Sequence, residues 1–204
     1  MNSNSELYTQ LAKYQQILEQ SPEYENLLLA LQRDGQEILP SLNEVDRSYL
    51  DEKLNILPQQ FNIVTALAKE KLYKVQEAIY SRKEYVSLIE LTSKALTELE
   101  DQFINTDKAP AAVLAKEAVS LQQAYRDLLG EVVSLGAAVD ELNQKKEAFR
   151  STGQPWQPDE MLKLVTLYHK LKRQIEQKIN LLEDTIEACQ EHEKMCIQFE
   201  AQLE

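Results

Sequence analysis

One stretch of this sequence restricts the possible folds more than any other. From Phe61 to Phe103 the chain reads FNIVTALAKEKLYKVQEAIYSRKEYVSLIELTSKALTELEDQF, with no glycine and no proline. A helix over this stretch would be roughly 65 Å long, whereas an average globular helix has only about 11–12 residues. Its apolar residues recur at steps of three and four, as on a helix that packs in a bundle. The pattern predicts one continuous helix from Asp46 to about Phe103, bent at most near Pro58.

The composition favours an all-helical protein. Only 4 of the 204 residues are glycine and 6 are proline, which leaves little material for folds built of strands and turns. The net charge of −12 argues against binding to nucleic acid or to an anionic membrane surface. We find no apolar run long enough for a membrane span and no signal peptide. The 2 cysteines, Cys189 and Cys196, would lie two helical turns apart, so we expect a reduced, cytoplasmic protein.

Breaks in the apolar pattern predict further helices on both sides of this long one. The first runs from Ser3 to about Leu42, and Pro22 is interpreted as a kink within it. The alternative is that Ser21 caps a second helix that starts at Pro22. Asn43 or Asp46 can cap the long helix that follows.

A third long helix is predicted from Pro110 to Phe149, weakened by Gly130 and Gly136. The sequence RSTGQPWQPDE then marks a loop. The last helix runs from Met161 towards the end of the chain.

The helices repeat after a shift of about 107 positions. This shift places the loop NEVDRSY opposite the loop STGQPW. It also aligns eight successive apolar positions: Leu54 with Met161, Leu57 with Leu164, Phe61 with Tyr168, Val64 with Leu171, Ala68 with Ile175, Leu72 with Ile179, Val75 with Leu182, and Ile79 with Ile186. We therefore predict that one unit occurs twice, with Phe61 and Tyr168 buried at the same level.

A unit of this length with three heptad helices resembles the spectrin repeat. That family implies tandem three-helix bundles in an elongated rod, in which the last helix of one repeat continues into the first helix of the next. The resemblance implies a repeat without its first helix at residues 1–80, a complete repeat at 81–189, and the start of a further helix at 190–204. Spectrin repeats usually carry a tryptophan in their first helix, whereas the only tryptophan here, Trp156, lies in a loop.

Two longer stretches carry a narrower resemblance, to the rods of giant nesprins, which are KASH-type linkers of the nuclear envelope. They are KYQQILEQSPEYENLLLALQRDGQEILPSLNEVDRSYL and DELNQKKEAFRSTGQPWQPDEMLKLVTLYHKLKRQIEQ. The resemblance implies a structural and docking segment on the cytoplasmic face of the outer nuclear membrane, as part of a LINC complex. Actin and a formin-type actin regulator are the implied partners. The alternative is a self-associating segment of a spectrin, dystrophin or plakin type of protein.

No catalytic motif or cofactor-binding motif is present, so we expect no enzyme activity and no cofactor. Cys189, His192 and Cys196 lie on one helical face, but three ligands spread over about 10 Å of a straight helix cannot surround one metal ion. His169 lies among basic residues, and no nucleophile is patterned with it. We therefore predict no metal site and no catalytic residue.

Candidate protein-binding residues fall into two groups. The basic island HKLKRQIEQK could bind an acidic partner, or its charges could pair with neighbouring glutamates on the same helix. Aromatic and arginine side chains are favoured in binding hot spots. The candidates are Tyr73, Tyr80, Arg82, Tyr85, Trp156, Lys170, Lys172 and Arg173.

The incomplete first repeat leads to a further expectation. Without a third helix, the seam between residues 1–42 and 46–80 should be open on one side. The residues expected to face water there are Leu7, Leu11, Tyr14 and Leu18. We expect this segment by itself to be a monomer that makes no direct membrane contact.

Overall fold

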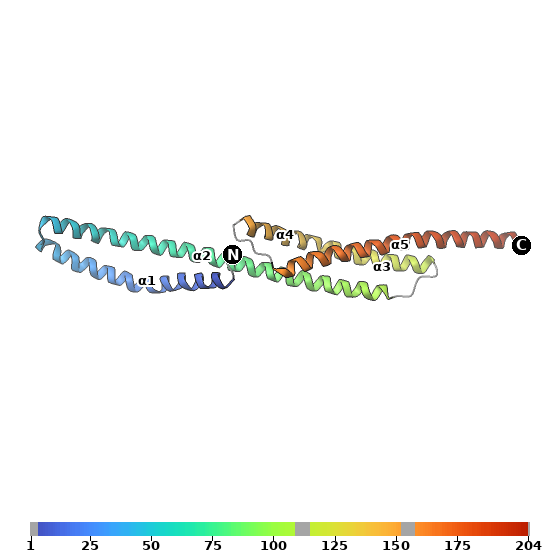
Figure 1. Ribbon diagram of the computed structural model, residues 1–204, viewed down its shortest axis with the longest axis horizontal. Helices are drawn as coiled ribbons and strands as arrows, with labels where there is room; N and C mark the ends of the chain where they lie inside the picture. Colours follow the sequence, from blue (N-terminus) through green and yellow to red (C-terminus); the bar gives the residue numbers. More distant parts are fainter. Residues whose placement is uncertain (1–3, 109–114, 152–157, 204) are drawn as a thin grey trace. The chain divides into compact units, whose positions relative to one another are not determined.

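The computed structural model describes residues 4–108, 115–151 and 158–203, which are helical apart from short turns. No strand occurs in these residues, so the protein is all-α, as predicted (Figure 1). The chain divides into two compact units, Met1–Lys83 and Glu84–Glu204. The elements in chain order are α1 (Asn4–Ile38), the 3₁₀-helix η1 (Leu39–Ser41), α2 (Glu44–Asp107), α3 (Ala115–Ser134), α4 (Gly136–Ser151) and α5 (Asp159–Leu203).

Helix α2 confirms the predicted long helix, because it runs for 64 residues without a break. It includes Pro58, which has no amide hydrogen and leaves the carbonyl oxygen of Leu54 without its helical donor. The Nε2 atom of Gln32, from α1, donates to that oxygen over 3.4 Å. A side chain of the neighbouring helix thus replaces the hydrogen bond that the proline removes.

Helix α1 also continues through a proline, so the interpretation as one helix with Pro22 inside it is confirmed. Pro22 leaves the carbonyl oxygen of Leu18 without a backbone donor. The hydroxyl of Ser21 donates to this oxygen over 2.8 Å. Ser21, which could have capped a new helix, therefore satisfies a free carbonyl of the continuous helix.

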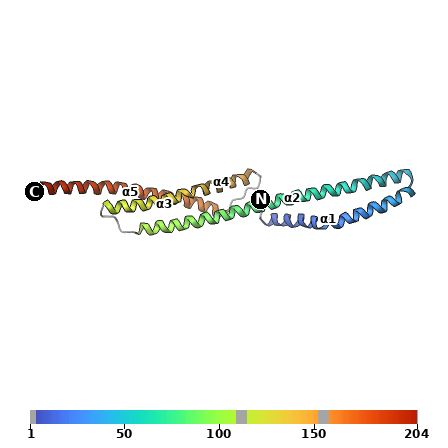
Figure 2. The ribbon, with the colours of Figure 1, turned by 180° about the vertical axis from the view of Figure 1, so that it is seen from behind.

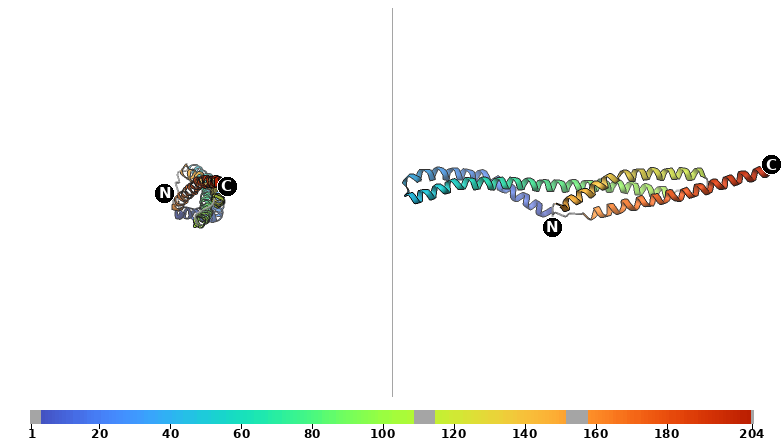
Figure 3. Two further views of the ribbon diagram at one scale, coloured as in Figure 1. Left: turned by 90° about the vertical axis from the view of Figure 1, so that its right-hand side faces the viewer. Right: turned by 90° about the horizontal axis from the view of Figure 1, so that it is seen from above.

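In the first unit, α1 and the first part of α2 form an antiparallel hairpin, and Figure 3 shows the two helices alongside each other. Asn43 caps α2, because its Oδ1 atom accepts from the amide of Asp46 at 2.9 Å. The Arg47 guanidinium donates to the carbonyl oxygens of Leu39 and Leu42, each at 3.1 Å. These bonds close the turn between the two helices.

In the second unit, α3 and α4 run antiparallel to α5 and to the last part of α2 (Figure 2). The four helices share one hydrophobic core, and α3 packs against α5 along its length. The core residues are Tyr85, Ile89, Leu96, Leu99, Phe103, Tyr125, Leu128, Val132, Val139, Leu142, Met161, Leu164, Tyr168, Leu171 and Ile175.

The predicted helix from Pro110 to Phe149 is interrupted, and its first five residues lie outside the described part of the chain. The break falls at Leu135, between α3 and α4, while Gly130 lies inside α3. At Gly136 a Cβ atom would lie 2.9 Å from the hydroxyl oxygen of Tyr168. The hydroxyl of this α5 tyrosine therefore lies close to the backbone at the start of α4.

Helix α5 continues past residue 189 to Leu203 without a boundary at the expected start of a further helix. Side chains 191–199 are all exposed. Among the described residues, no helix of the second unit therefore covers side chains 191–199 of α5.

Candidate docking surfaces

The predicted binding residues of α2 do not share one environment. Tyr73 and Tyr80 belong to the first unit and are 61% and 64% exposed. The Tyr73 hydroxyl donates to Oε1 of Glu77 at 3.2 Å, and this carboxylate raises the pKa of the phenol. The two tyrosines are available to a partner. Trp156 lies outside the described residues.

Arg82, in the first unit, and Tyr85, in the second, are both buried. The Arg82 guanidinium donates to Oδ1 of Asn4 at 2.9 Å, and burial lowers the pKa of the arginine. The Tyr85 ring meets the edge of Phe149 at 5.5 Å between ring centroids, and burial raises the pKa of its phenol. A partner could reach neither side chain without opening these contacts.

The basic island lies on α5 in the second unit, and its members differ in their contacts. The Nζ atom of Lys170 lies 3.1 Å from Oε1 of Glu100 and therefore links α5 to α2. Lys172 is half-buried and Arg173 is exposed. In the described part of the chain, neither of these two residues forms an ion pair. The expected pair of Arg173 with Glu176 is therefore not formed. Their charges are available to an acidic partner.

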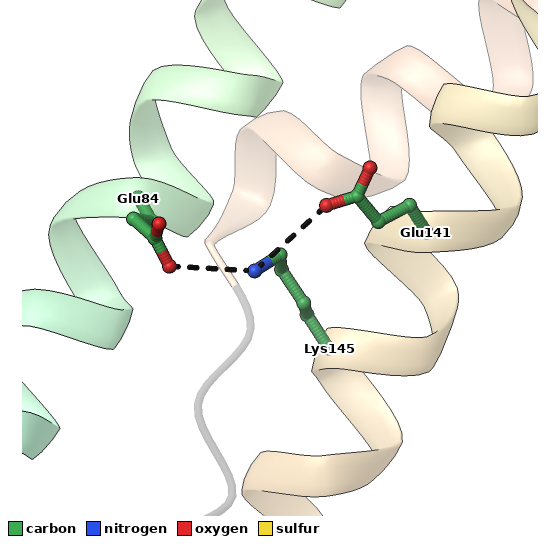
Figure 4. A network of polar contacts seen from close by, with 3 residues as sticks. All are labelled: Glu84, Glu141 and Lys145. Atoms are coloured by element: carbon green, nitrogen blue, oxygen red, sulfur yellow. Dashed lines mark hydrogen bonds and ion pairs between the residues drawn. The ribbon is translucent and has the colours of Figure 1, made fainter.

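Two further polar networks hold α2 against its neighbours in the second unit. Lys145 of α4 lies between Glu84 of α2, at 3.5 Å, and Glu141 of its own helix, at 3.8 Å (Figure 4). Near the end of α2, the Asp107 carboxylate pairs with Lys178 of α5 and accepts a hydrogen bond of 3.0 Å from the hydroxyl of Tyr125.

The charges around Asp107 shift two pKa values. The Lys178 ammonium holds the pKa of Asp107 below its ordinary value. Burial, together with the neighbouring carboxylate of Asp107, raises the pKa of Tyr125 to about 12. At neutral pH the ionised carboxylate of Asp107 accepts this hydrogen bond and the neutral phenol of Tyr125 donates it.

An apolar groove lies on the first unit, between α1 and the first part of α2. Its volume is about 390 Å³. Gln60 contributes the one side-chain amide to the lining of the groove, and no charged side chain lines the groove. The lining residues are Tyr24, Leu27, Leu28, Leu31, Leu57, Gln60, Phe61 and Val64.

The position of this groove corrects two expectations from the sequence. Leu7 was expected to face water but is buried, and Leu11, Tyr14 and Leu18 are half-buried, because the start of α1 packs against α2. The open part of the seam lies nearer the turn. There Phe61 is only half-buried, while Tyr168 is buried, so the prediction of equal burial is wrong. A periodic stripe marks the face of a helix but not whether another element covers it.

The side chains at the end of α5 do not form a metal site. Cys196 Sγ and His192 Nδ1 lie 3.8 Å apart on the exposed helix surface. Among the described residues, no group of three or more histidine, cysteine or acidic side chains could hold a metal ion. No described helix has the length and apolar character required to cross a membrane.

The chain was compared with protein families and with solved structures. No family profile matches the chain, and no solved structure gives a significant match to it.

Proposed function

We propose that this chain is a non-catalytic structural and docking segment of a cytoskeletal linker, built of two spectrin-like units. The observation that carries the proposal is the continuity of α2, which passes the boundary at Lys83 and Glu84 without losing helical structure. Ordering the 64 residues of this helix costs conformational entropy, and packing of the helix against its neighbours has to offset that cost. A continuous backbone between two packed units suits a protein that carries load along its length.

The setting that we propose is the rod of a giant nesprin, on the cytoplasmic face of the outer nuclear membrane. Such a linker connects the nucleus to actin and recruits actin regulators, a formin among them. The resemblance of the two long sequence stretches quoted above to nesprin rods supports this assignment. A rod segment of such a linker needs surfaces for packing and exposed residues for docking, and it does not need a catalytic site.

The docking surface that we propose for an acidic partner is the pair Lys172 and Arg173. Its support is that both cations are without an ion pair in the described part of a chain with a net charge of −12. Cations of this kind mainly accelerate association with an acidic surface and select its orientation. Lys170 is a weaker candidate because it already pairs with Glu100.

The test is binding of the full chain to filamentous actin, by co-sedimentation, and to the purified N-terminal half of a formin, by calorimetry. The double charge reversal Lys172→Glu with Arg173→Glu should weaken binding at least about ten-fold, since like charges then face each other. The matched control is Lys116→Glu with Arg126→Glu, two exposed residues of α3. It makes the same change of net charge elsewhere on the same unit.

Equal loss of affinity in both double variants would mean that only the net charge matters, and the proposed surface would be wrong. Binding of neither actin nor the formin by the unchanged chain would remove the linker assignment itself.

A further inference from the structure

The two ends of the hairpin in the first unit lie together. Asn4, the first residue of α1, accepts a hydrogen bond of 2.9 Å from the guanidinium of Arg82 in α2. Arg82 is buried, and so is Leu7, about one turn further along α1. The hairpin is therefore closed at the end away from its turn. We call this end, formed by Asn4, Leu7 and Arg82, the mouth of the hairpin.

A second closure of the hairpin lies near its turn. A Cβ atom at Gly35 would lie 2.7 Å from Cδ1 of the buried Leu54, so the two helices approach each other closely there. Gln32 also donates to the carbonyl oxygen of Leu54. The apolar groove, with the exposed Val64 in its lining, lies between this closure and the mouth. The seam is thus closed at both ends and open to water at the groove.

The second unit joins α2 and α5 in a different way. Ion pairs link Glu100 to Lys170 and, further along both helices, Asp107 to Lys178. The two helices therefore run in the same direction, with the shared core between them. A pull on the start of this part of α2 and on the far end of α5 would slide one helix along the other. Many contacts would carry the load at the same time.

Tension acts differently on a hairpin whose two ends lie together. A pull on Asn4 and on Arg82 separates α1 from α2 at the mouth. Each contact then carries the load only after the contact before it has broken, so few contacts resist at any moment. Forced opening is governed by the barrier that has to be crossed, and this barrier is lower when contacts break one after another.

We propose that the first unit is a zipper that opens from its mouth under tension while the second unit stays folded. The proposal rests on the load-bearing role proposed above. Once Asn4 and Leu7 have left α2, the open groove offers little resistance, and opening proceeds to the closure at Leu54. Both helices keep their internal hydrogen bonds, so the segment lengthens at low load and closes again when the load is removed.

The test is an optical-trap experiment on the full chain, which is held at its two ends and stretched slowly. The first event should be a reversible lengthening of about 110 Å, the length of α1 and residues 44–82 laid end to end as helices. Loss of helical structure over the same residues would instead give roughly 270 Å, at about 3.4 Å per residue. The length of the step therefore distinguishes opening from unfolding.

A matched pair of substitutions tests where opening begins, because Leu7 and Leu54 are both buried in the first unit but lie at different closures. Leu7→Ala should raise the rate of opening at constant force at least about ten-fold, since its contacts break before the barrier is crossed. Leu54→Ala should mainly slow reclosing, because contacts near the turn form first.

A milder variant avoids any change to the apolar core. Asn4→Ala removes the acceptor of the Arg82 hydrogen bond and should raise the rate of opening roughly three-fold. The matched control is Asn55→Ala, because the side chain of this exposed asparagine bonds only to its own helix, at the carbonyl of Asp51, among the hydrogen bonds of the described residues. Its rate of opening should equal that of the unchanged chain.

Three results would overturn the proposal. The first is a first event that Leu164→Ala, in the core of the second unit, accelerates and Leu7→Ala does not. The second is a first step of roughly 270 Å. The third is equal acceleration by Leu7→Ala and Leu54→Ala, which would mean that the hairpin opens in one concerted step.

The zipper and the linker function can fail separately. A chain that binds actin or the formin but gives one of these three results keeps its linker assignment and loses the zipper. A chain that opens from its mouth but binds neither partner keeps the zipper and loses the linker assignment.

Discussion

The two units carry the same apolar pattern but bury it differently. Leu164 and Leu57 are equivalent positions, yet Leu164 is 2% exposed and Leu57 is 37% exposed. Leu171 and Val64 differ more, at 0% and 55%. The pattern on each helix is sufficient to form the helix, whereas burial depends on what packs over it.

The covering element explains the difference. In the second unit the last part of α2 contributes Ile89, Leu96 and Leu99 to a core shared with α3, α4 and α5. In the first unit, α1 and α2 contact each other along one seam, and among the residues described there the groove side of this seam is exposed. A third helix therefore turns a stripe of half-exposed residues into a closed core.

The largest expected effect separates the two units through one matched pair of substitutions. Leu164→Ala should lower the free energy of unfolding of the second unit by about 2–5 kcal/mol, since it leaves a cavity in a closed core. Leu57→Ala should cost the first unit less than about half of that, because its side chain already meets water. Urea unfolding by circular dichroism, with hydrogen exchange to assign each transition, would measure both. Equal losses would show that the two faces are equally covered in solution.

The next effect concerns the helix that belongs to both units. Ser81→Pro should cost about 3 kcal/mol, because proline removes a backbone hydrogen bond and clashes with the preceding turn. Hydrogen exchange should show faster exchange around residues 77–85, with protection of the α3 and α5 amides retained. Unchanged exchange there would mean that α2 is not continuous at the boundary in solution. Glu44→Pro, at the exposed first position of α2, is a milder control, since the first turn of a helix tolerates proline.

A pair of glycines should respond in opposite directions. At Gly35 of the first unit, a Cβ atom would lie 2.7 Å from Cδ1 of the buried Leu54, so Gly35→Ala should destabilise by about 1–3 kcal/mol. At Gly130 of the second unit no atom lies within 4 Å of the added Cβ, so Gly130→Ala should stabilise α3 by about 0.5–1 kcal/mol. Thermal melts of both variants would check the signs. Stabilisation by Gly35→Ala would show that α1 and α2 approach less closely than they do here.

The smallest effect depends on pH and tests the clamp at the end of α2. Because Lys178 lowers the pKa of Asp107, this pair stabilises the second unit above the ordinary pKa of 3.8. The contribution is lost as the pH falls through the lower pKa of the folded state. Asp107→Asn should therefore cost up to about 1 kcal/mol at neutral pH, as is usual for a partly exposed pair.

The measurement for this prediction is the free energy of unfolding of the unchanged chain and the Asp107→Asn variant across the acid range. The difference between them should shrink towards zero as Asp107 becomes protonated. A difference that stays constant with pH would mean that the lost stability comes from packing or hydrogen bonding and not from the ion pair with Lys178.

Much of the local structure follows from residues that are neighbours in the chain. Asn43 caps α2 through the amide of Asp46, three residues on, and the absence of glycine and proline after Pro58 allows α2 to continue. The hydroxyl of Ser21 satisfies the carbonyl that Pro22 leaves free, so α1 stays one helix. Such interactions act within one or two turns, and the sequence displays both partners together.

Other features required contacts between residues that are distant in sequence. Tyr85 was a candidate binding residue from the sequence, but it is buried against Phe149 of α4. The hydroxyl of Tyr168 from α5 lies close to the backbone at Gly136, directly after the break at Leu135, whereas Gly130 lies inside α3. Nothing next to these residues in the sequence reports the approach of the other helix.

The same division applies to the candidate docking surfaces. The sequence by itself determined that the chain forms long amphipathic helices, because helical periodicity and capping are local properties of the backbone and its nearest side chains. Only the tertiary structure decided that Arg82 is buried, that Lys172 is without an ion pair among the described residues, and that an apolar groove stays open beside Val64. The physical reason is that exposure and pairing depend on which helix lies opposite, and packing between helices is a non-local property.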